Sequence, residues 1–356
     1  TDTGKRLHKA IAAQIRKLDY TRPITAAEDK TPDKSTIYDE CDAIGINYNL
    51  SIYDAVHKMR PDKPIFASEC CATGTTRDWN FDTAVSGRIQ DKDRDTNDWF
   101  LGREKTYKFL RKRSYVFGCY QWAAVEHRGE AAWPRVCSCS GALDLFLQKK
   151  GAFYQNKSHW TKDPMAHIVP HWNFKGLEGR EIPVTVYTNC EELELFLNGK
   201  PLGKRQIEKY GHGEWSVEYI PGTLEVKGYI GGKEVCCDKR VTTGRPAALK
   251  LTQDNDFTAN GSDIVLFTCE CVDENGLAVP DAAEYVRFSV SAPAKIIGTG
   301  SDNCDHNNAA NTDRKMYMGK IRVAVKPKKG QESFTLTAMS DNCGVCEKTV
   351  SLCAEN

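Results

Sequence analysis

The sequence has neither a large excess of charge of one sign nor a long apolar run. Its 356 residues include 49 Lys and Arg against 48 Asp and Glu, which gives a formal net charge of +1 at pH 7. Without a basic excess, neither nucleic acid nor an anionic membrane surface is expected as the main partner. No apolar stretch approaches the roughly 20 residues that a membrane-spanning helix needs, so we expect no membrane-embedded segment.

The fifteen cysteines lack the even number and regular spacing of a disulfide framework. Residues 70–71 and 236–237 are adjacent pairs, which rarely bridge to each other. Reduced thiols are therefore favoured, as in a cytoplasmic protein. Cys343 and Cys346 have the spacing of zinc ligands, but a structural zinc site takes four ligands and usually a second such pair. Neither a metal nor another cofactor is expected.

Helical and strand patterns alternate in the N-terminal part of the chain. Residues 4–18 carry apolar side chains at helical spacing, which predicts a helix. The segments expected to follow are strand 24–27, strand 43–46, helix 51–59, strand 65–67, helix 98–113 and strand 115–122. Because parallel strands need crossover connections, this order predicts a parallel α/β sheet.

Three of these strands end in a side chain that suits chemistry: Tyr48, Glu69 and Trp122. A (β/α)8 barrel keeps its active site at the carboxyl ends of its strands. Glu69 follows the apolar run Ile65–Ala67, and a carboxylate in that position can act as a nucleophile on a sugar. The alternative is a carboxylate that caps a neighbouring helix or pairs with an arginine. Four strands are only half of such a barrel and leave its core unclosed.

After about residue 165 the pattern changes to short strands separated by turns. Residues 181–188 and 191–197 alternate apolar and polar side chains, as half-buried strands do. Asn198-Gly199 is a strong hairpin signal, and Gly231-Gly232 predicts a second hairpin. These features predict a β-sandwich, and similar short strands continue to the end of the chain.

Several motifs occur together along the chain: Asn47-Tyr48, Ser68-Glu69, Tyr120-Gln121-Trp122, Gly129-Glu130, Trp133-Pro134, 167–173 and 194–199. In combination they resemble glycoside hydrolase family 2, the family of β-galactosidases and β-glucuronidases. The last two segments resemble the accessory sandwich of many bacterial β-galactosidases of the family. The resemblance covers essentially the whole chain, and the combination is specific although no single motif is. With the reduced thiols, it predicts a bacterial cytoplasmic location.

The resemblance implies a fold of class α/β plus all-β with three domains. Residues 1–165 would form the C-terminal half of a (β/α)8 TIM barrel. Residues 166–245 would form an accessory β-sandwich, and residues 246–356 a second immunoglobulin-like β-sandwich. Within the last domain, the polar segment 301–314 is expected to be a surface loop.

The resemblance also assigns roles to particular residues. Glu69 would be the catalytic nucleophile, and Tyr48 would hydrogen-bond it and hold it ionised. Trp122 would form an apolar wall of the sugar subsite. The alternatives are a barrel-core tyrosine and a tryptophan that only packs. The further candidates for substrate binding are Asn47, Glu130 and Trp79, the last in the long polar loop 72–95.

Two departures from the family pattern have consequences. The family often has an aromatic residue and glycine after the nucleophile, whereas Cys70-Cys71 follow here. The family's acid/base glutamate lies in an Asn-Glu pair that would precede Thr1, together with the first four barrel strands. Glu28, Glu126 and Glu130 do not match that position. The isolated chain is therefore expected to be inactive and to need the N-terminal half of the same polypeptide as its partner.

The expected activity is that of a retaining β-glycosidase, with β-galactosidase favoured and a β-linked oligosaccharide or glycoside as substrate. The family's β-glucuronidases use an Asn-x-Lys motif, which is absent from residues 128–150. The alternatives are a non-catalytic carbohydrate-binding or interaction fragment, and a family enzyme with another specificity, such as a β-glucuronidase or β-mannosidase. Homo-oligomerisation is left open by the sequence.

Overall fold

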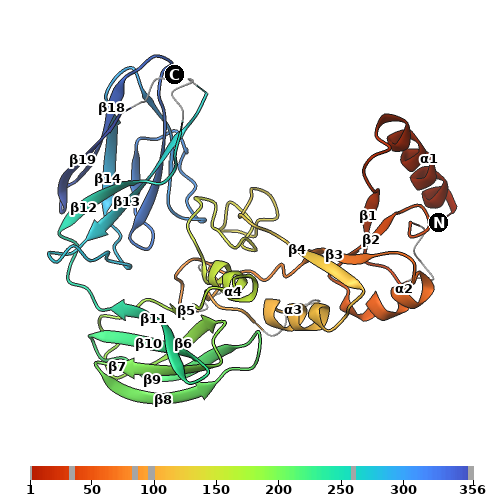
Figure 1. Cartoon of the computed structure of the whole chain (residues 1–356). Helices are drawn as coiled ribbons and strands as arrows, with labels where there is room; N and C mark the ends of the chain where they lie inside the picture. The colour runs from red at the N-terminus through yellow and green to blue at the C-terminus, as the bar shows by residue number, and fades with distance from the viewer. Residues whose placement is uncertain (1, 32–36, 82–86, 95–100, 258–261, 352–356) are drawn as a thin grey trace. The chain divides into compact units, whose positions relative to one another are not determined.

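The structure, a computed structural model, describes residues 2–31, 37–81, 87–94, 101–257 and 262–351. The chain divides into two compact units. The first unit comprises Thr1–Thr75, Lys92–Glu126 and Cys139–Ala142. The second unit comprises Thr76–Asp91, His127–Ser138 and Leu143–Asn356. The elements from α1 to β4 belong to the first unit, and those from α4 to β19 belong to the second (Figure 1).

The first unit is built on a four-stranded parallel sheet in the order β1-β2-β3-β4. Its elements are α1 (Asp2–Leu18), β1 (Thr25–Glu28), β2 (Ala43–Asn47), a 3-10 turn (Leu50–Ile52), α2 (Tyr53–Met59), β3 (Ile65–Cys70), α3 (Arg103–Arg111) and β4 (Val116–Gln121). The predicted alternation is confirmed. The expected helix 98–113 is shorter in the structure, and residues 95–100 lie outside the described part of the chain.

Local side chains explain where α3 begins and what the sheet buries. Both carboxylate oxygens of Asp93 accept hydrogen bonds at 3.0 Å from the backbone N–H groups of Arg103 and Glu104. These bonds satisfy two donors that the first turn of a helix leaves open. The core of the unit consists mainly of apolar side chains from β2, β3, α2 and α3: Ile44, Ile46, Ile65, Ala67, Tyr53, Val56, Tyr107 and Leu110.

The apolar stripe of α1 is not buried. Leu7, Ile11, Ile15 and Leu18 stand at helical spacing as predicted, yet they are 60, 49, 41 and 89% exposed. Ala12 is the buried residue of this helix. An amphipathic helix normally packs such a stripe against a core, so α1 presents an apolar face without a covering layer in the described structure.

The second unit begins with a helix and a β-sandwich. Helix α4 (Gly151–Trp160) precedes the sheets β5-β6-β9 and β11-β10-β7-β8. The strands are β5 (Ala166–Val169), β6 (Glu181–Thr188), β7 (Glu192–Leu197), β8 (Lys200–Gln206), β9 (His212–Glu218), β10 (Thr223–Ile230) and β11 (Lys233–Val241). The Asn198-Gly199 hairpin is confirmed, with φ angles of 52° and 79° that suit its tight turn. Both sheets contribute to one apolar core around Trp172.

A second sandwich follows in the same unit. Its sheets are β12-β13-β17-β15 and β16-β14-β18-β19. The strands are β12 (Ala248–Gln253), β13 (Val265–Val272), β14 (Tyr285–Val290), β15 (Lys295–Gly300), β16 (Asp313–Lys315), β17 (Lys320–Lys326), β18 (Ser333–Ser340) and β19 (Gly344–Ser351). Both sheets share one core that includes Phe267, Phe288 and Phe334.

The prediction of a polar surface loop over residues 301–314 is wrong at its C-terminal end. Asp313 and Arg314 belong to β16, and Arg314 is only 3% exposed. The Arg314 guanidinium is held by Asp305 at 2.6 Å and by the hydroxyl of Thr299 at 3.0 Å. The charge of Arg314 is thus neutralised inside the fold, which allows this side chain to be buried.

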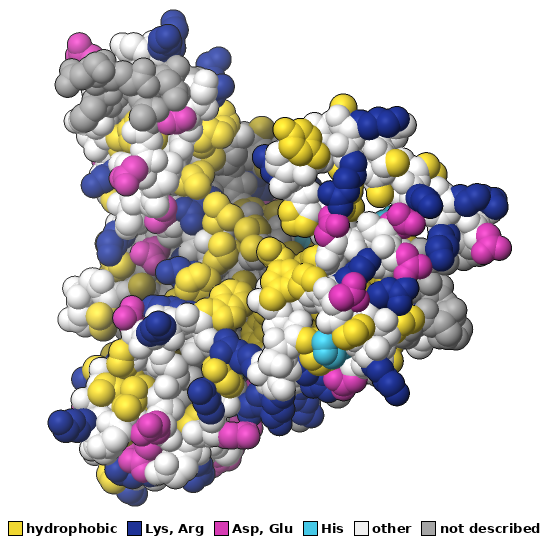
Figure 2. Space-filling model, turned by 45° about the vertical axis from the view of Figure 1, so that its right-hand side comes forward, with side chains coloured by type: hydrophobic (Ala, Val, Ile, Leu, Met, Phe, Trp, Pro, Cys, Tyr) yellow, Lys and Arg dark blue, Asp and Glu magenta, His cyan; other side chains and the backbone are white. Residues whose placement is uncertain are grey.

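The visible face in Figure 2 shows Lys and Arg side chains interspersed with Asp and Glu. Among the described residues, none of the helices combines the length and the apolar character that crossing a membrane requires.

Candidate functional site

Glu69 lies at the carboxyl end of β3, between the ends of its two parallel neighbours. Asn47 is its register partner on β2, and the Tyr48 N–H donates a 2.9 Å hydrogen bond to the Glu69 carbonyl. On the other side, the Trp122 N–H donates to the Cys70 carbonyl at 2.8 Å. The backbone therefore brings Asn47, Tyr48, Glu69 and Trp122 to one edge of the sheet. Glu69 and Ser68 are partly exposed, after the buried run Ile65–Ala67.

Asn47 is fixed by a neighbour on β3. The hydroxyl of Ser68 donates a 2.8 Å hydrogen bond to Asn47 Oδ1. Gly45 makes room for this arrangement, because a Cβ there would lie 2.6 Å from Ser68 Oγ and 2.9 Å from the Ala26 carbonyl. The Ser-Glu pair thus has two functions in the fold: the serine orients the asparagine, and the glutamate is presented at the strand end.

Two residues near Glu69 adopt a left-handed backbone conformation, which is unfavourable for residues other than glycine. Tyr48 has a φ of 54° and Cys71 a φ of 61°. Both follow directly on the ends of strands, at the edge that carries Glu69. Left-handed backbone at non-glycine residues is uncommon and is concentrated at functional sites, where the surrounding structure maintains it.

The two thiols next to Glu69, those of Cys70 and Cys71, are buried and in contact with each other. Cys70 and Cys71 are each 1% exposed, and their sulfur atoms lie 3.4 Å apart. Hydrogen bonds with Cys119 and Cys71, together with burial, raise the pKa of Cys70. Cys70 therefore remains a neutral thiol near pH 7, and it packs in the core below the strand end.

The remaining carboxylates that the sequence offers have other surroundings. In the first unit, Glu28 accepts hydrogen bonds from the N–H groups of Asp29 and Lys30 at 3.0 and 3.1 Å, so it fixes the turn after β1. Glu126 is buried, with 2% exposure. Glu130 belongs to the second unit, where its carboxylate lies 3.4 Å from His127 Nε2.

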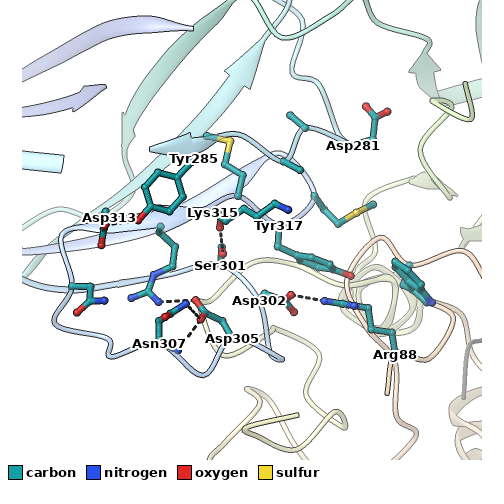
Figure 3. A pocket seen from close by; sticks show the side chains of 17 residues that line it. Arg88, Asp281, Tyr285, Ser301, Asp302, Asp305, Asn307, Asp313, Lys315 and Tyr317 are labelled. Atoms are coloured by element: carbon teal, nitrogen blue, oxygen red, sulfur yellow. Dashed lines mark hydrogen bonds and ion pairs between the residues drawn. The ribbon is translucent and has the colours of Figure 1, made fainter. Parts of the chain in front are cut away.

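Trp79 also belongs to the second unit, where it lines a polar cavity of about 600 Å³ (Figure 3). The guanidinium of Arg88 stacks on the Trp79 ring at 5.2 Å and on the Tyr317 ring at 5.0 Å. The other lining residues come from the second sandwich and include Tyr285, Asp302 and Asp313. They were not predicted as site residues, because they are scattered over separate segments and form no sequence motif.

The comparison with known proteins decides the family. Residues 249–349 match the glycoside hydrolase family 2 C-terminal domain 5, and residues 179–236 match a domain of unknown function, DUF4982. A β-galactosidase of Bacteroides ovatus is 30% identical over 98% of this chain and 44% of its own length. A family 2 glycosyl hydrolase from Bacteroides cellulosilyticus has a TM-score of 0.83 at 28% identity, over 99% of this chain and 46% of that one.

The chain belongs to glycoside hydrolase family 2. The resemblance seen in the motifs is thus confirmed. This family 2 chain spans less than half the length of the two relatives just described, and corresponds to their C-terminal part. Names within the family differ: a putative β-glucuronidase of Formosa agariphila is 33% identical over 64% of this chain and 23% of its own length. The family is therefore clear, whereas the relatives' names leave the sugar open.

Proposed function

We propose that this chain carries the nucleophile of a retaining β-glycosidase and that Glu69 is that nucleophile. The observation that carries the proposal is the position of Glu69: a partly exposed carboxylate after a buried strand, flanked by Tyr48 and Trp122 through backbone hydrogen bonds. Family membership adds the reaction class, because glycoside hydrolysis with retention uses such a carboxylate.

The proposed reaction has two steps. The Glu69 carboxylate attacks the anomeric carbon, and the bond from that carbon to the aglycone oxygen breaks as a general acid protonates the oxygen. Water then hydrolyses the glycosyl ester, with the same acid group now acting as base. Tyr48 would donate a hydrogen bond that orients Glu69, and Trp122 would form an apolar wall for the sugar. Asn47, whose side chain accepts a hydrogen bond from Ser68, would bind a sugar hydroxyl.

We further infer that the parallel sheet is the second half of a (β/α)8 barrel. The support is its four strands in sequence order and the uncovered apolar stripe of α1. The partner in this proposal is the N-terminal half of the same polypeptide, which would supply the acid/base about 5–5.5 Å from Glu69. Without it, ordinary glycosides should not react, since general acid catalysis contributes about 10²–10⁴-fold.

A β-galactoside is the favoured substrate. The support is the Bacteroides ovatus relative named as a β-galactosidase and the absence of an Asn-x-Lys segment from residues 128–150. The second candidate is a β-glucuronide, because relatives over about two thirds of this chain carry that name. A mannoside has no such support here.

The test uses the longer protein that contains this chain. We expect Glu69→Gln to abolish hydrolysis of 4-nitrophenyl β-galactoside, because an amide cannot form the glycosyl ester. A fluorinated galactosyl fluoride should label the wild type on the peptide that contains Glu69. Glu192→Gln, an exchange of the same kind in the second unit, serves as the control and should retain activity. Turnover by Glu69→Gln, or labelling of another peptide, would disprove the assignment; faster hydrolysis of the β-glucuronide would reassign the sugar.

A further inference from the structure

The cavity in the second unit is formed by an exposed sheet face and a neighbouring loop. Tyr285 on β14 and Lys315 on β16 are direct cross-strand partners, and both side chains are exposed. Their strand neighbours Val286 and Arg314 are both buried; Val286 belongs to the apolar core of the sandwich, whereas Arg314 lines the cavity. Figure 3 shows Tyr285 and Asp313 on one side of the cavity, Arg88 and Asp302 on the other, and Lys315 between them. The volume of about 600 Å³ is typical of a small-molecule site.

Most charged groups of the cavity wall form ion pairs or hydrogen bonds with other residues of the wall. Asp302 pairs with Arg88, and Asp305 pairs with Arg314 at 2.6 Å. Asp313 accepts the hydroxyl of Tyr285. These contacts fix the side chains in place, so a ligand would meet a preorganised polar surface with little ordering left to occur. The same contacts mean that the carboxylates of Asp302, Asp305 and Asp313 already have partners within the protein.

The wall favours a neutral ligand over a charged one. Four carboxylates line the cavity, those of Asp281, Asp302, Asp305 and Asp313, against three basic groups, those of Arg88, Arg314 and Lys315. Lys315 is the lining cation without an ion pair in the described part of the chain. A ligand carboxylate would therefore gain one ammonium partner and meet several like charges. Among the described residues, no group of three or more potential metal ligands occurs.

An aromatic ring stands at each end of this polar surface. The Tyr285 ring is 50% exposed at one end. At the other end, the guanidinium of Arg88 lies over the rings of both Trp79 and Tyr317. The guanidinium of Arg77 also lies over the Tyr317 ring, at 5.2 Å from its centre. Arg77 is in turn fixed by a buried 2.7 Å ion pair with Asp144. This stack positions Trp79, and the hydrogen bond to Asp313 positions Tyr285. Aromatic surfaces that are positioned in advance contribute contact area at little cost in conformational entropy.

We propose that this cavity binds a neutral oligosaccharide. A sugar ring has an apolar C–H face that suits an aromatic ring and a rim of hydroxyls that suits amides, carboxylates and ammonium groups. Asn307 and Asn311 also line the cavity, so both donors and acceptors are available. The site adds a glycan-binding surface to the chain that the family assignment does not include. Its choice of a galactose-containing ligand rests on the proposed function.

The experiment is affinity electrophoresis of the longer protein in gels that contain neutral β-1,4-galactan. Glu69→Gln is present throughout, so that turnover does not alter the gel. We expect galactan to retard migration, and Tyr285→Ala or Trp79→Ala to weaken binding about tenfold, because each removes one aromatic contact. Tyr20→Ala, which removes an 83% exposed ring in the first unit, is the matched control and should not change binding.

The outcomes separate this site from the Glu69 assignment. Equal retardation of Tyr285→Ala and its parent, with unchanged melting temperatures, would overturn the cavity as the binding site. An absence of retardation by galactan would do the same. Stronger retardation by polygalacturonate than by galactan would overturn the preference for a neutral glycan. If Glu69→Gln retains hydrolysis, the nucleophile assignment fails while the effect of Tyr285→Ala still reports on the cavity.

Discussion

At the scale of single residues, the carboxyl group of Asp91 is expected to make the stability of the second unit depend on pH. Its carboxylate accepts hydrogen bonds from the N–H groups of Gly151 at 2.9 Å and Asp78 at 3.0 Å, so it satisfies a donor at the start of α4. Gly151 permits this contact, because a Cβ there would lie 2.6 Å from the Asp91 carbonyl. Burial raises the pKa of Asp91 to about 6. The folded state therefore holds a proton that the unfolded chain releases near pH 3.8.

This shift predicts a loss of stability with rising pH. A raised folded-state pKa contributes stability that is complete below pH 3.8 and is lost as the pH rises through about 6. The difference of about two pKa units between the folded and unfolded states corresponds to roughly 3 kcal/mol in the free energy of unfolding. We expect the free energy of unfolding of the wild type to fall by that amount relative to Asp91→Asn between pH 4 and pH 7, measured by urea denaturation.

The comparison with Asp91→Asn cancels the other titrating groups. His171, whose pKa burial lowers, acts in the opposite direction in both proteins. The same pH slope in the wild type and in Asp91→Asn would show that Asp91 does not titrate in this range.

At the scale of elements, a glycine on strand β10 leaves room for two thiols that lie close enough to form a disulfide. Cys190, which follows β6, and Cys236, on β11, have sulfur atoms 3.4 Å apart. Gly228 on β10 is the cross-strand partner of Cys236, and a Cβ there would lie 2.7 Å from both sulfur atoms. The hydrogen bond with Cys236 lowers the pKa of Cys190 to about 6, which favours the reactive thiolate near neutral pH.

Oxidised glutathione should therefore join Cys190 and Cys236. The Cys190 thiolate attacks the glutathione disulfide and releases one glutathione thiolate; Cys236 then attacks the mixed disulfide and releases the second glutathione. We expect mass spectrometry to show one internal disulfide without a glutathione adduct, and the melting temperature to rise because the unfolded chain is constrained. Cys190→Ser should lose both effects, and Gly228→Ala should lower the yield. A stable glutathione adduct on the wild type would contradict the prediction.

The helices and strands differ in how well the sequence predicts them. The parallel strands are visible as short apolar runs, and their shared direction alone predicts that Tyr48, Glu69 and Trp122 meet at one edge. Helix α4 could not be found in this way, because its buried face includes Gln155, Asn156 and His159 rather than an apolar stripe. The cavity was also invisible, since Trp79, Tyr285 and Lys315 come from separate segments that only the tertiary structure joins.

At the scale of the whole molecule, the first unit leaves apolar side chains of a helix and of its sheet exposed. A parallel sheet normally has both faces covered by helices and a closed or protected edge. Here α1 exposes Leu7, Ile11, Ile15 and Leu18, and β4 exposes Phe117 and Tyr120 at 61 and 65%. The second unit differs, because each of its sandwiches encloses its own apolar core. The exposed faces thus belong to the unit for which a missing half is proposed.

The last prediction tests this proposal by making the stripe polar. In residues 1–356 alone, Leu7→Glu with Ile11→Glu should reduce the binding of a hydrophobic fluorescent dye without lowering the melting temperature of the second unit. In the longer protein the same pair should destabilise the barrel by several kcal/mol. Truncation of a buried Leu or Ile to Ala lowers the free energy of unfolding by roughly 2–5 kcal/mol, and burial of a charged side chain lowers it further. Leu277→Glu, at a 42% exposed site of the second unit, is the control and should have little effect on either protein. If the pair left the longer protein as stable as the control does, the α1 stripe would not be the surface that the proposed N-terminal half covers.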